Sequence, residues 1–288
     1  MEIFTVLAPS REQNEQMRAL EESCHAFDGS FSQAYLETTY NVDPNMPAFI
    51  LAMEDQILLG FAYLYADEPG EVDVTLYVAP SHRRNGIMKK LLVSLEKLAQ
   101  NYGLVDLEFV TERVFLEQHP NFCRHLGLEI LEGSEIWLTL PAGQRYEQEE
   151  RAELDLLLAD EGQLPAIVDF QQRAFNHDEE TARHYAQTSL ANSQAQLYVF
   201  QKEGRVCGSC TVDISGSVCH FFGLAMDPAD QGQGLGTYFM QALINHLTEQ
   251  LAWGFQLVVE DENLKARKFY EKLGFKERTE VLYLKEKR

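Results

Sequence analysis

The sequence predicts a mixed α/β fold that occurs twice in one chain. Apolar strand-like runs alternate with helix-like runs along the whole length, which favours a sheet flanked by helices. Turn residues at Glu54-Asp55 and at Glu203-Gly204 indicate two hairpins. The length of 288 residues exceeds one typical domain core of about 100–200 residues. We therefore expect two domains.

An internal repeat relates the two halves of the chain. The run RRNGIM, which follows the strand-like VDVTLYVAP, matches a second glycine-containing turn, so that Gly86 and Gly234 stand 148 residues apart. Residues 122–128 match residues 269–275 at an offset of 147. Two offsets that agree within one residue indicate duplication of a whole domain. A repeat this long predicts two similar folds rather than a solenoid.

The elements of the first copy follow from short apolar runs for strands and longer periodic runs for helices. The predicted elements, in chain order, are strand 3–7, helices 11–24 and 31–40, strands 48–53, 57–65 and 71–78, helix 85–102, strand 105–110, a short helix ending at 126 and closing strands up to 140. The second copy follows the same plan. The polar segment 141–153 predicts a tether between a first domain, 1–140, and a second domain, 154–288.

A glycine-rich turn between a strand and a helix is the first chemical signal. Gln231, Gly234 and Gly236 lie in a Q-x-x-G-x-G spacing after the apolar VCHFFGLAM and before TYFMQALINHLTEQL. Glycines let the backbone approach a ligand, and the first N–H groups of a helix lack internal partners. The turn therefore predicts a phosphate site, although its spacing matches neither a P-loop nor G-x-G-x-x-G.

A second motif lies downstream, where a V-x3-N-x2-A-x3-Y-x3-G-F pattern is formed by Val259, Asn263, Ala266, Tyr270, Gly274 and Phe275. Together with the glycine turn, this pattern resembles the GNAT superfamily of acetyl-CoA-dependent N-acetyltransferases. The resemblance covers most of residues 152–288 and is strongest over 222–275. It implies two tandem GNAT-like domains, each with a splayed mixed sheet, and transfer of an acetyl group from acetyl-CoA to a primary amine in a ternary complex.

The resemblance also implies roles for individual positions. Asn263 would bind the cofactor, and Tyr270 would protonate the departing thiolate. The backbone of the preceding strand would pair with the pantetheine arm, and the turn would hold the diphosphate. The implied cofactor residues are Leu224, Ala225, Met226, Gln231, Gly232, Gln233, Gly234, Leu235, Gly236, Thr237, Asn263, Ala266 and Arg267. Lys265, Arg267 and Lys268 form a basic cluster that could meet phosphates or could be a solvated helix face.

Two residues compete for the role of general base. His220 lies on the same side of an ideal strand as Phe222, Leu224 and Met226, and the unperturbed pKa of histidine is near neutral pH. A packing histidine is the alternative interpretation. Glu260 follows the strand beside the expected thioester, and a surface carboxylate is its alternative. A water molecule relayed to either residue would also serve.

The two copies differ at the chemical positions. The first copy has Val72, Met88, Leu116 and Cys123 where the second has His220, Gly236, Asn263 and Tyr270. We therefore expect a degenerate first domain and an active site in the second. The turn 83–86 could still bind a phosphate. Cys123 is expected to pack rather than to act as a nucleophile.

Composition bounds the remaining possibilities. The formal charge of −21, from 45 acidic and 24 basic residues, argues against a nucleic-acid partner and suits a cationic amine or peptide acceptor. No apolar run is long enough to span a membrane, and the start of the chain lacks a secretory pattern, so a cytoplasmic protein is expected. Cys207 and Cys210 in a strand are too far apart for a disulfide, and no metal site is expected.

Two other functions stay open at this point. The chain could be a catalytically silent acetyl-CoA-binding regulator, or an acyltransferase that uses a different acyl donor or a protein N-terminus as acceptor. The presence of Asn263 and Tyr270 favours an active acetyltransferase over the silent regulator.

Overall fold

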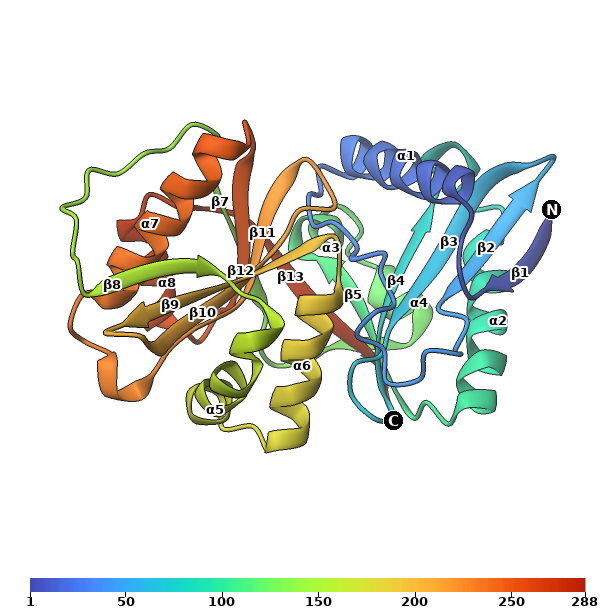
Figure 1. The fold of residues 1–288 in the computed structure, drawn as a ribbon. Helices are drawn as coiled ribbons and strands as arrows, with labels where there is room; N and C mark the ends of the chain where they lie inside the picture. The colour runs from blue at the N-terminus through green and yellow to red at the C-terminus, as the bar shows by residue number, and fades with distance from the viewer. Residues whose placement is uncertain (288) are drawn as a thin grey trace. The chain divides into compact units, whose positions relative to one another are not determined.

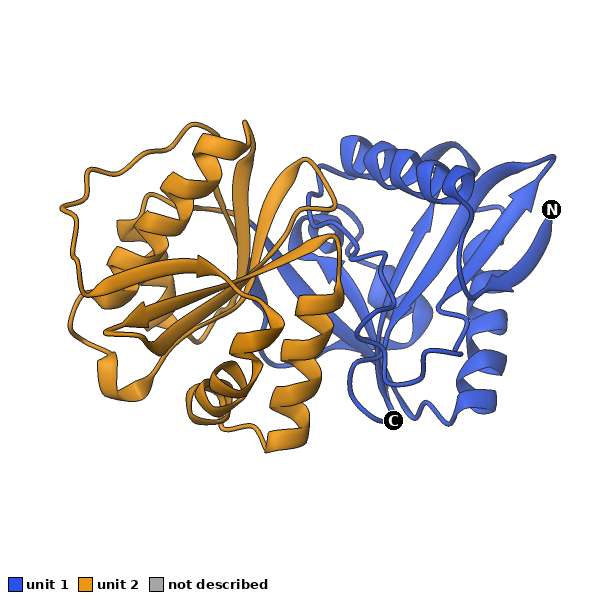
Figure 2. Ribbon diagram, in the orientation of Figure 1, with its two compact units in different colours: residues 1–136, 279–288 blue, residues 137–278 orange. Residues whose placement is uncertain are grey.

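The computed structural model describes residues 1–287 and divides into two compact units (Figures 1 and 2). Unit 1 comprises Met1–Ile136 together with the C-terminal segment that begins at Thr279, and unit 2 comprises Trp137–Arg278. Each unit contains a mixed sheet flanked by helices, so the predicted fold class is confirmed.

The unit boundaries differ from the predicted ranges 1–140 and 154–288. Most of the strand that closes the first copy belongs to unit 2, and most of the last strand of the chain belongs to unit 1. Either exchange gives the edge of a sheet a hydrogen-bonded neighbour and removes unpaired edge backbone groups. The exchange of closing strands could not be read from sequence periodicity. Both copies have the same strand pattern, so the pattern does not say which sheet a closing strand joins.

Unit 1 is built on a sheet with strand order β1-β2-β3-β4-β5-β13, with β6 also pairing with β13. Its strands are β1 (Glu2–Val6), β2 (Phe49–Glu54), β3 (Ile57–Tyr65), β4 (Glu71–Val78), β5 (Asp106–Glu112), β6 (Leu128–Ile130) and β13 (Lys276–Glu286). Its helices are α1 (Arg11–Asp28), η1 (Pro80–His82), α2 (Ile87–Tyr102), α3 (Arg113–Gln118) and α4 (Phe122–Leu126). Only β4 and β5 run parallel among the pairs with a defined register.

Helices α1 and α2 cover opposite faces of the unit 1 sheet. A Cβ at Gly60 of β3 would lie 3.1 Å from Ile87 of α2. The next residue, Phe61, contacts Tyr77, and Tyr77 contacts His25 of α1. Successive strand residues point to opposite faces, so these contacts assign one helix to each face.

The segment 31–40, predicted as a helix, is irregular in the structure. Three of its first N–H groups are bound by side chains from other elements. Phe31 and Ser32 donate to the Glu112 carboxylate, and Ala34 donates to Glu21. Long-range acceptors thus replace the helical hydrogen bonds that local periodicity predicted.

Unit 2 repeats the plan with strand order β7-β12-β11-β10-β9-β8. Its strands are β7 (Glu135–Leu140), β8 (Leu154–Leu158), β9 (Ala195–Lys202), β10 (Arg205–Asp213), β11 (Val218–Met226) and β12 (Gly254–Glu260). Its helices are η2 (Glu161–Gln163), α5 (Leu164–Phe175), α6 (Glu179–Ala191), η3 (Pro228–Asp230), α7 (Leu235–Gln250) and α8 (Leu264–Lys272).

The two faces of the unit 2 sheet carry different helices. Val199 of β9 packs into a buried cluster with Phe170 of α5 and Ala186 of α6. The neighbouring residue, Phe200, stacks on Phe239 of α7 with ring centroids 5.1 Å apart. Helices α5 and α6 therefore cover one face, and α7 covers the other.

The segment 141–153, predicted as a tether, is packed against unit 2. The Tyr146 N–H donates to the side-chain oxygen of Asn245 at 2.8 Å, and the Asn245 amide donates back to the Tyr146 carbonyl at 2.9 Å. Thr248 donates to the Gln144 carbonyl. This segment is thus part of the folded unit, although its polar composition resembles a flexible linker.

None of the helices in the described part of the chain combines the length and the apolar character needed to cross a bilayer.

Candidate functional site

The strands β11 and β12 separate within the unit 2 sheet. Their parallel pairing runs from Val218 and Gly254 to Phe221 and Leu257. Strand β11 then continues for five residues to Met226, and β12 for three residues to Glu260. Backbone groups beyond the paired region are therefore open to another hydrogen-bonding partner, as the splayed sheet predicts.

A bulge in β11 coincides with this separation. Thr211 of β10 pairs with Phe222 and Ser209 pairs with Ala225, so two residues of β11 stand opposite one residue of β10. Gly223 has a φ of +57°, which favours glycine over other residues. The bulge bends the strand where a ligand arm would have to enter.

The bulge also corrects the predicted side-chain alternation. His220 and Phe222 share a face with Ala225, because all three pair with alternate residues of β10. Met226 lies on the opposite face, where its sulfur is 2.8 Å from an ideal Cβ on Gly208. The prediction that His220 and Met226 share one side was therefore wrong, since one extra residue reverses the alternation.

The glycine turn leads directly into α7. Gly232 and Gly234 have φ values of +75° and +78°, and Gly234 is the N-cap. The first helical hydrogen bond runs from the Tyr238 N–H to the Gly234 carbonyl, so the N–H groups of residues 235–237 precede it. A Cβ at Gly232 or Gly234 would meet no atom within 4 Å. The space over the turn is open, which fits an anion held by these N–H groups.

Two glutamines hold the turn itself. The Gln231 side chain donates to the Met226 carbonyl at 3.1 Å, and the Gln233 side chain donates to the Ala229 carbonyl at 3.1 Å. These contacts tie the end of β11 and the middle of η3 to the turn that follows. They give both side chains a structural role beside the predicted contact with the cofactor.

Helix α8 carries the second motif. Asn263 is its N-cap, and its side-chain oxygen accepts from the Ala266 N–H at 3.0 Å. Tyr270 is half-buried between Phe269 and Phe275, with centroid distances of 5.1 and 5.8 Å. Burial raises the pKa of Tyr270 well above its usual value, so the phenol stays protonated and able to donate a proton at neutral pH.

The two candidate bases have different surroundings. His220 lies in the paired part of β11, and its ring contacts Trp137 edge-on at 5.6 Å. Burial lowers the pKa of His220 to about 4, against a smaller opposing effect of Asp213. The near-neutral pKa expected from sequence is thus absent. Glu260 is exposed at the end of β12, beyond the point where the strands separate.

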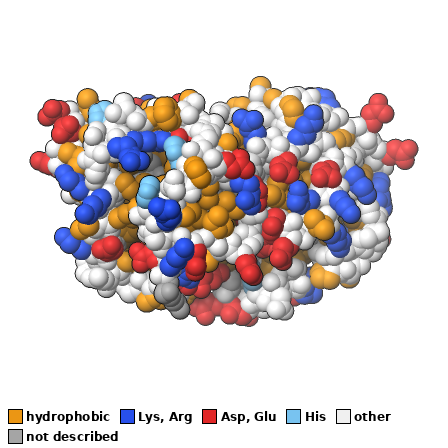
Figure 3. Space-filling model, turned by 180° about the vertical axis from the view of Figure 1, so that it is seen from behind, with side chains coloured by type: hydrophobic (Ala, Val, Ile, Leu, Met, Phe, Trp, Pro, Cys, Tyr) orange, Lys and Arg blue, Asp and Glu red, His pale blue; other side chains and the backbone are white. Residues whose placement is uncertain are grey.

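The basic cluster on α8 is partly engaged. Arg267 pairs with Glu277 at 3.0 Å, whereas the side chains of Lys265 and Lys268 belong to exposed residues. Figure 3 shows one face of the molecule, on which basic and acidic side chains are interspersed. The net charge of −21 therefore does not give this face a uniform acidic surface.

In the corresponding turn of unit 1, the side chain of Arg83 is bound by protein groups. The Arg83 guanidinium donates two hydrogen bonds of 2.6 Å to the buried carboxylate of Asp28. Its Nε donates to the Val78 carbonyl, the counterpart of the Met226 carbonyl. Arg83, which could have bound a phosphate, is thus already paired.

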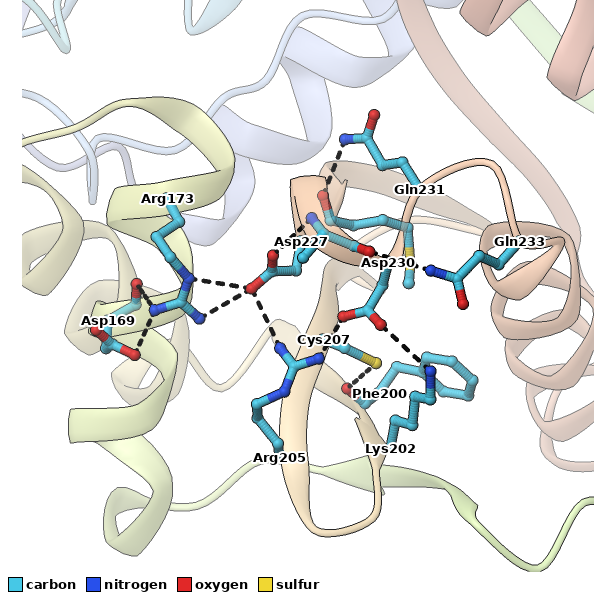
Figure 4. A network of polar contacts seen from close by, with 12 residues as sticks. Asp169, Arg173, Phe200, Lys202, Arg205, Cys207, Asp227, Asp230, Gln231 and Gln233 are labelled. Carbon is cyan, nitrogen blue, oxygen red and sulfur yellow. Dashed lines mark hydrogen bonds and ion pairs between the residues drawn. The ribbon is translucent and has the colours of Figure 1, made fainter.

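Sequence reasoning missed a charged network behind the unit 2 turn (Figure 4). Asp227 and Asp230 are buried and paired with Arg173, Lys202 and Arg205 from α5 and from the β9–β10 hairpin. An open groove of about 650 Å³ is lined by Arg173, Arg205 and Asp227 but contains none of the predicted cofactor residues. The partners lie too far apart in sequence to form a motif.

The thiols of unit 2 are buried and unreactive. Cys207 and Cys210 are free within β10, and burial raises the pKa of Cys207 to about 11. Because the thiolate is the nucleophilic form, these residues are suited to packing. Within residues 1–287 no group of three histidine, cysteine or acidic side chains could hold a metal ion.

Comparison with known proteins agrees with this geometry. A model of the acetyltransferase (GNAT) family matches residues 14–119 and 164–275. The chain is 30% identical over 119 residues to [ribosomal protein bS18]-alanine N-acetyltransferase of Escherichia coli (strain K12), covering 40% of this chain and 76% of that protein.

Solved structures share the fold over nearly the whole chain. A GCN5-related N-acetyltransferase from Sphaerobacter thermophilus has a TM-score of 0.73 at 16% identity, covering 99% of this chain and 95% of that one. A tandem GNAT protein from the clavulanic acid biosynthesis pathway has a TM-score of 0.72 at 15% identity, covering 99% and 98%. The two-domain arrangement is therefore a known form of this fold.

Proposed function

Because the chain belongs to the acetyltransferase (GNAT) family and is an N-acetyltransferase, we propose that it transfers an acetyl group from acetyl-CoA to the primary amine of an acceptor. We place the active site in unit 2. One observation carries the proposal: β11 and β12 separate beside an open glycine turn at the start of α7. This arrangement offers strand backbone to the amides of a pantetheine arm and helix N–H groups to a diphosphate.

The residues present fit the cofactor. The N–H groups of the turn, including Gly232, Gly234 and Gly236, would hold the diphosphate, and the strand beyond the bulge would hold the arm. Asn263 would contact the cofactor through the side-chain NH2, since its oxygen caps α8. Acetyl-CoA itself supplies the acetyl group as an activated thioester.

The chemistry requires two proton transfers. The amine nitrogen forms a bond to the acetyl carbon, the carbon–sulfur bond breaks, and the thiolate takes a proton from Tyr270. The ammonium proton passes to a base. Holding both reactants together can lower the barrier by several kcal/mol, and each positioned acid or base typically adds about 10²–10⁴-fold.

Glu260, directly or through a water molecule, is the better candidate base. It lies at the open end of β12, whereas His220 lies in the paired region against Trp137. A histidine with a pKa of about 4 is a weak acceptor for an ammonium proton.

The acceptor could belong to either of two classes, a small-molecule amine or the N-terminal amine of a protein. The Escherichia coli relative is named for acetylation of an alanine of a ribosomal protein, which favours a protein N-terminal amine over a small amine. Labelled acetyl transfer to peptides with N-terminal alanine, polyamines, aminoglycosides and free amino acids would separate these classes. Transfer to small amines alone would exclude the protein acceptor.

A matched pair of substitutions tests the site assignment. Gly234→Trp fills the open turn of unit 2, and Gly86→Trp makes the same change at a φ of +79° in unit 1. In calorimetry with coenzyme A, we expect one site per chain, lost in the first variant and retained in the second. Loss of binding in Gly86→Trp alone would move the site to unit 1.

A further inference from the structure

Two buried carboxylates stand directly before the glycine turn of unit 2 (Figure 4). The Asp227 carboxylate accepts from Arg173 at 3.0 Å and from Arg205 at 3.3 Å. The Asp230 carboxylate accepts from Arg205 and pairs with Lys202 at 3.5 Å. Both aspartate side chains are only 5% exposed.

These carboxylates create an electrostatic conflict at an anion site. Two negative charges next to the turn would repel a diphosphate, and burial weakens the screening by solvent. Burial alone would raise the pKa of Asp227, but the Ala229 N–H and the Arg173 guanidinium outweigh it and lower the pKa. Asp227 is therefore ionised at neutral pH, and its charge must be balanced by the surrounding cations.

Unit 1 shows that the turn forms without this network. At the same offset of 148 residues, Asp227, Asp230, Arg205 and Lys202 correspond to Ala79, His82, Ile57 and Glu54. The backbone contact is nevertheless the same in both units. The Ala79 N–H donates to Leu59 at 2.9 Å, and the Asp227 N–H donates to Cys207 at 2.8 Å. The charged network thus occurs in the unit with the proposed site and is unnecessary for the fold of the turn.

The network also joins three elements at one point. Arg173 comes from α5, Arg205 begins β10, and Asp227 follows β11. Asp227 additionally accepts from the Ala229 N–H at 3.0 Å, which orients the 3₁₀ turn that leads to Gln231. The two guanidinium groups thus contact the residues from which the glycine turn starts.

We propose that Arg205 and Arg173 are positioning residues for the diphosphate. Acting through Asp227 and Asp230, they cancel the negative charge that would repel the ligand. This inference rests on the proposed function of unit 2. It assigns both arginines to cofactor affinity rather than to the chemical step, so their loss raises the KM for acetyl-CoA and leaves kcat nearly unchanged.

Charge-balanced variants test this role. In calorimetry with coenzyme A, Arg205→Gln is expected to raise Kd about tenfold, equal to about 1.4 kcal/mol. Because Arg173 also pairs with Asp169, Arg205→Gln leaves two cations, Arg173 and Lys202, against three carboxylates. Adding Asp230→Asn to Arg205→Gln removes the excess negative charge and should restore most of the affinity, and Arg205→Lys should retain it. Arg183→Gln is the matched control, because Arg183 pairs with Glu179 on α6 outside the network.

Each result has a defined meaning. Wild-type affinity in Arg205→Gln would overturn the inference and leave the proposed function standing. A double variant that binds no better than Arg205→Gln, with an unchanged melting temperature, would overturn charge cancellation. Loss of affinity in Arg205→Lys would indicate a purely geometric requirement and would also contradict it. Absence of coenzyme A binding by the wild type would defeat the proposed function together with the inference.

Discussion

The backbone N–H of Phe31 donates to both carboxylate oxygens of Glu112, at 2.7 and 2.9 Å. The Ser32 N–H and hydroxyl donate to the same carboxylate, which is only 4% exposed. Glu112 ends β5 at the position that Glu260 occupies at the end of β12, 148 residues later. The same residue type is thus structural in unit 1 and exposed in unit 2.

Parallel substitutions should separate these two roles. Glu112→Gln replaces one acceptor oxygen with an NH2 group that faces N–H donors, so it should lower the free energy of unfolding by about 1–3 kcal/mol. Glu260→Gln should change stability by less than about 0.5 kcal/mol and should lower kcat. Urea unfolding and labelled acetyl transfer measure both effects. Unchanged kcat in Glu260→Gln would exclude Glu260 as the base.

Tyr270→Phe should lower kcat about 100-fold but leave measurable turnover, because positioning contributes more than one proton transfer. Because burial raises the pKa of Tyr270, wild-type kcat should not fall between pH 7 and pH 9 through loss of its proton. A pH profile of kcat checks this. Cys123→Ser, at the matching position of unit 1, is the control and should leave kcat unchanged. A decline of wild-type kcat at alkaline pH that is absent in Tyr270→Phe would contradict the raised pKa.

Local signals explain what the sequence predicted well. Gly234 and its counterpart Gly86 both adopt positive φ, so this position of the turn favours glycine and could be recognised from residue type alone. The bulge at Gly223 could not, because a glycine within an apolar strand is compatible with regular pairing. The network was also hidden, since Arg173 meets Asp227 across 54 residues. Features defined by neighbours in sequence were predictable, and those defined by contacts across the sheet were not.

His220 should make stability depend on pH. Its folded pKa of about 4 lies below the unfolded value of about 6.5, so the unfolded chain binds the proton first. The contribution of neutral His220 to the free energy of unfolding is fully present above pH 6.5. As the pH falls from 6.5 towards 4, the free energy of unfolding decreases by on the order of 1–3 kcal/mol. Urea unfolding at pH 7 and pH 5 should therefore show a smaller difference for His220→Gln than for the wild type. Equal differences would mean that the ring is not desolvated as the structure indicates.

The exchanged strands should make substitutions act on the unit at the other end of the sequence. Leu284 of β13 is 1% exposed and its strand pairs with β5, whereas Leu138 of β7 is 2% exposed and belongs to unit 2. Leu284→Ala and Leu138→Ala should each cost about 2–5 kcal/mol through the buried cavity that they leave.

Amide hydrogen exchange distinguishes the two variants. Leu284→Ala should lower protection first in β5, although the substituted residue lies near the C-terminus, and Leu138→Ala should lower it first in β12. Coenzyme A binding should weaken more in Leu138→Ala, because β12 borders the proposed site. Protection lost first in β12 of Leu284→Ala would show that the last strand supports the second unit instead.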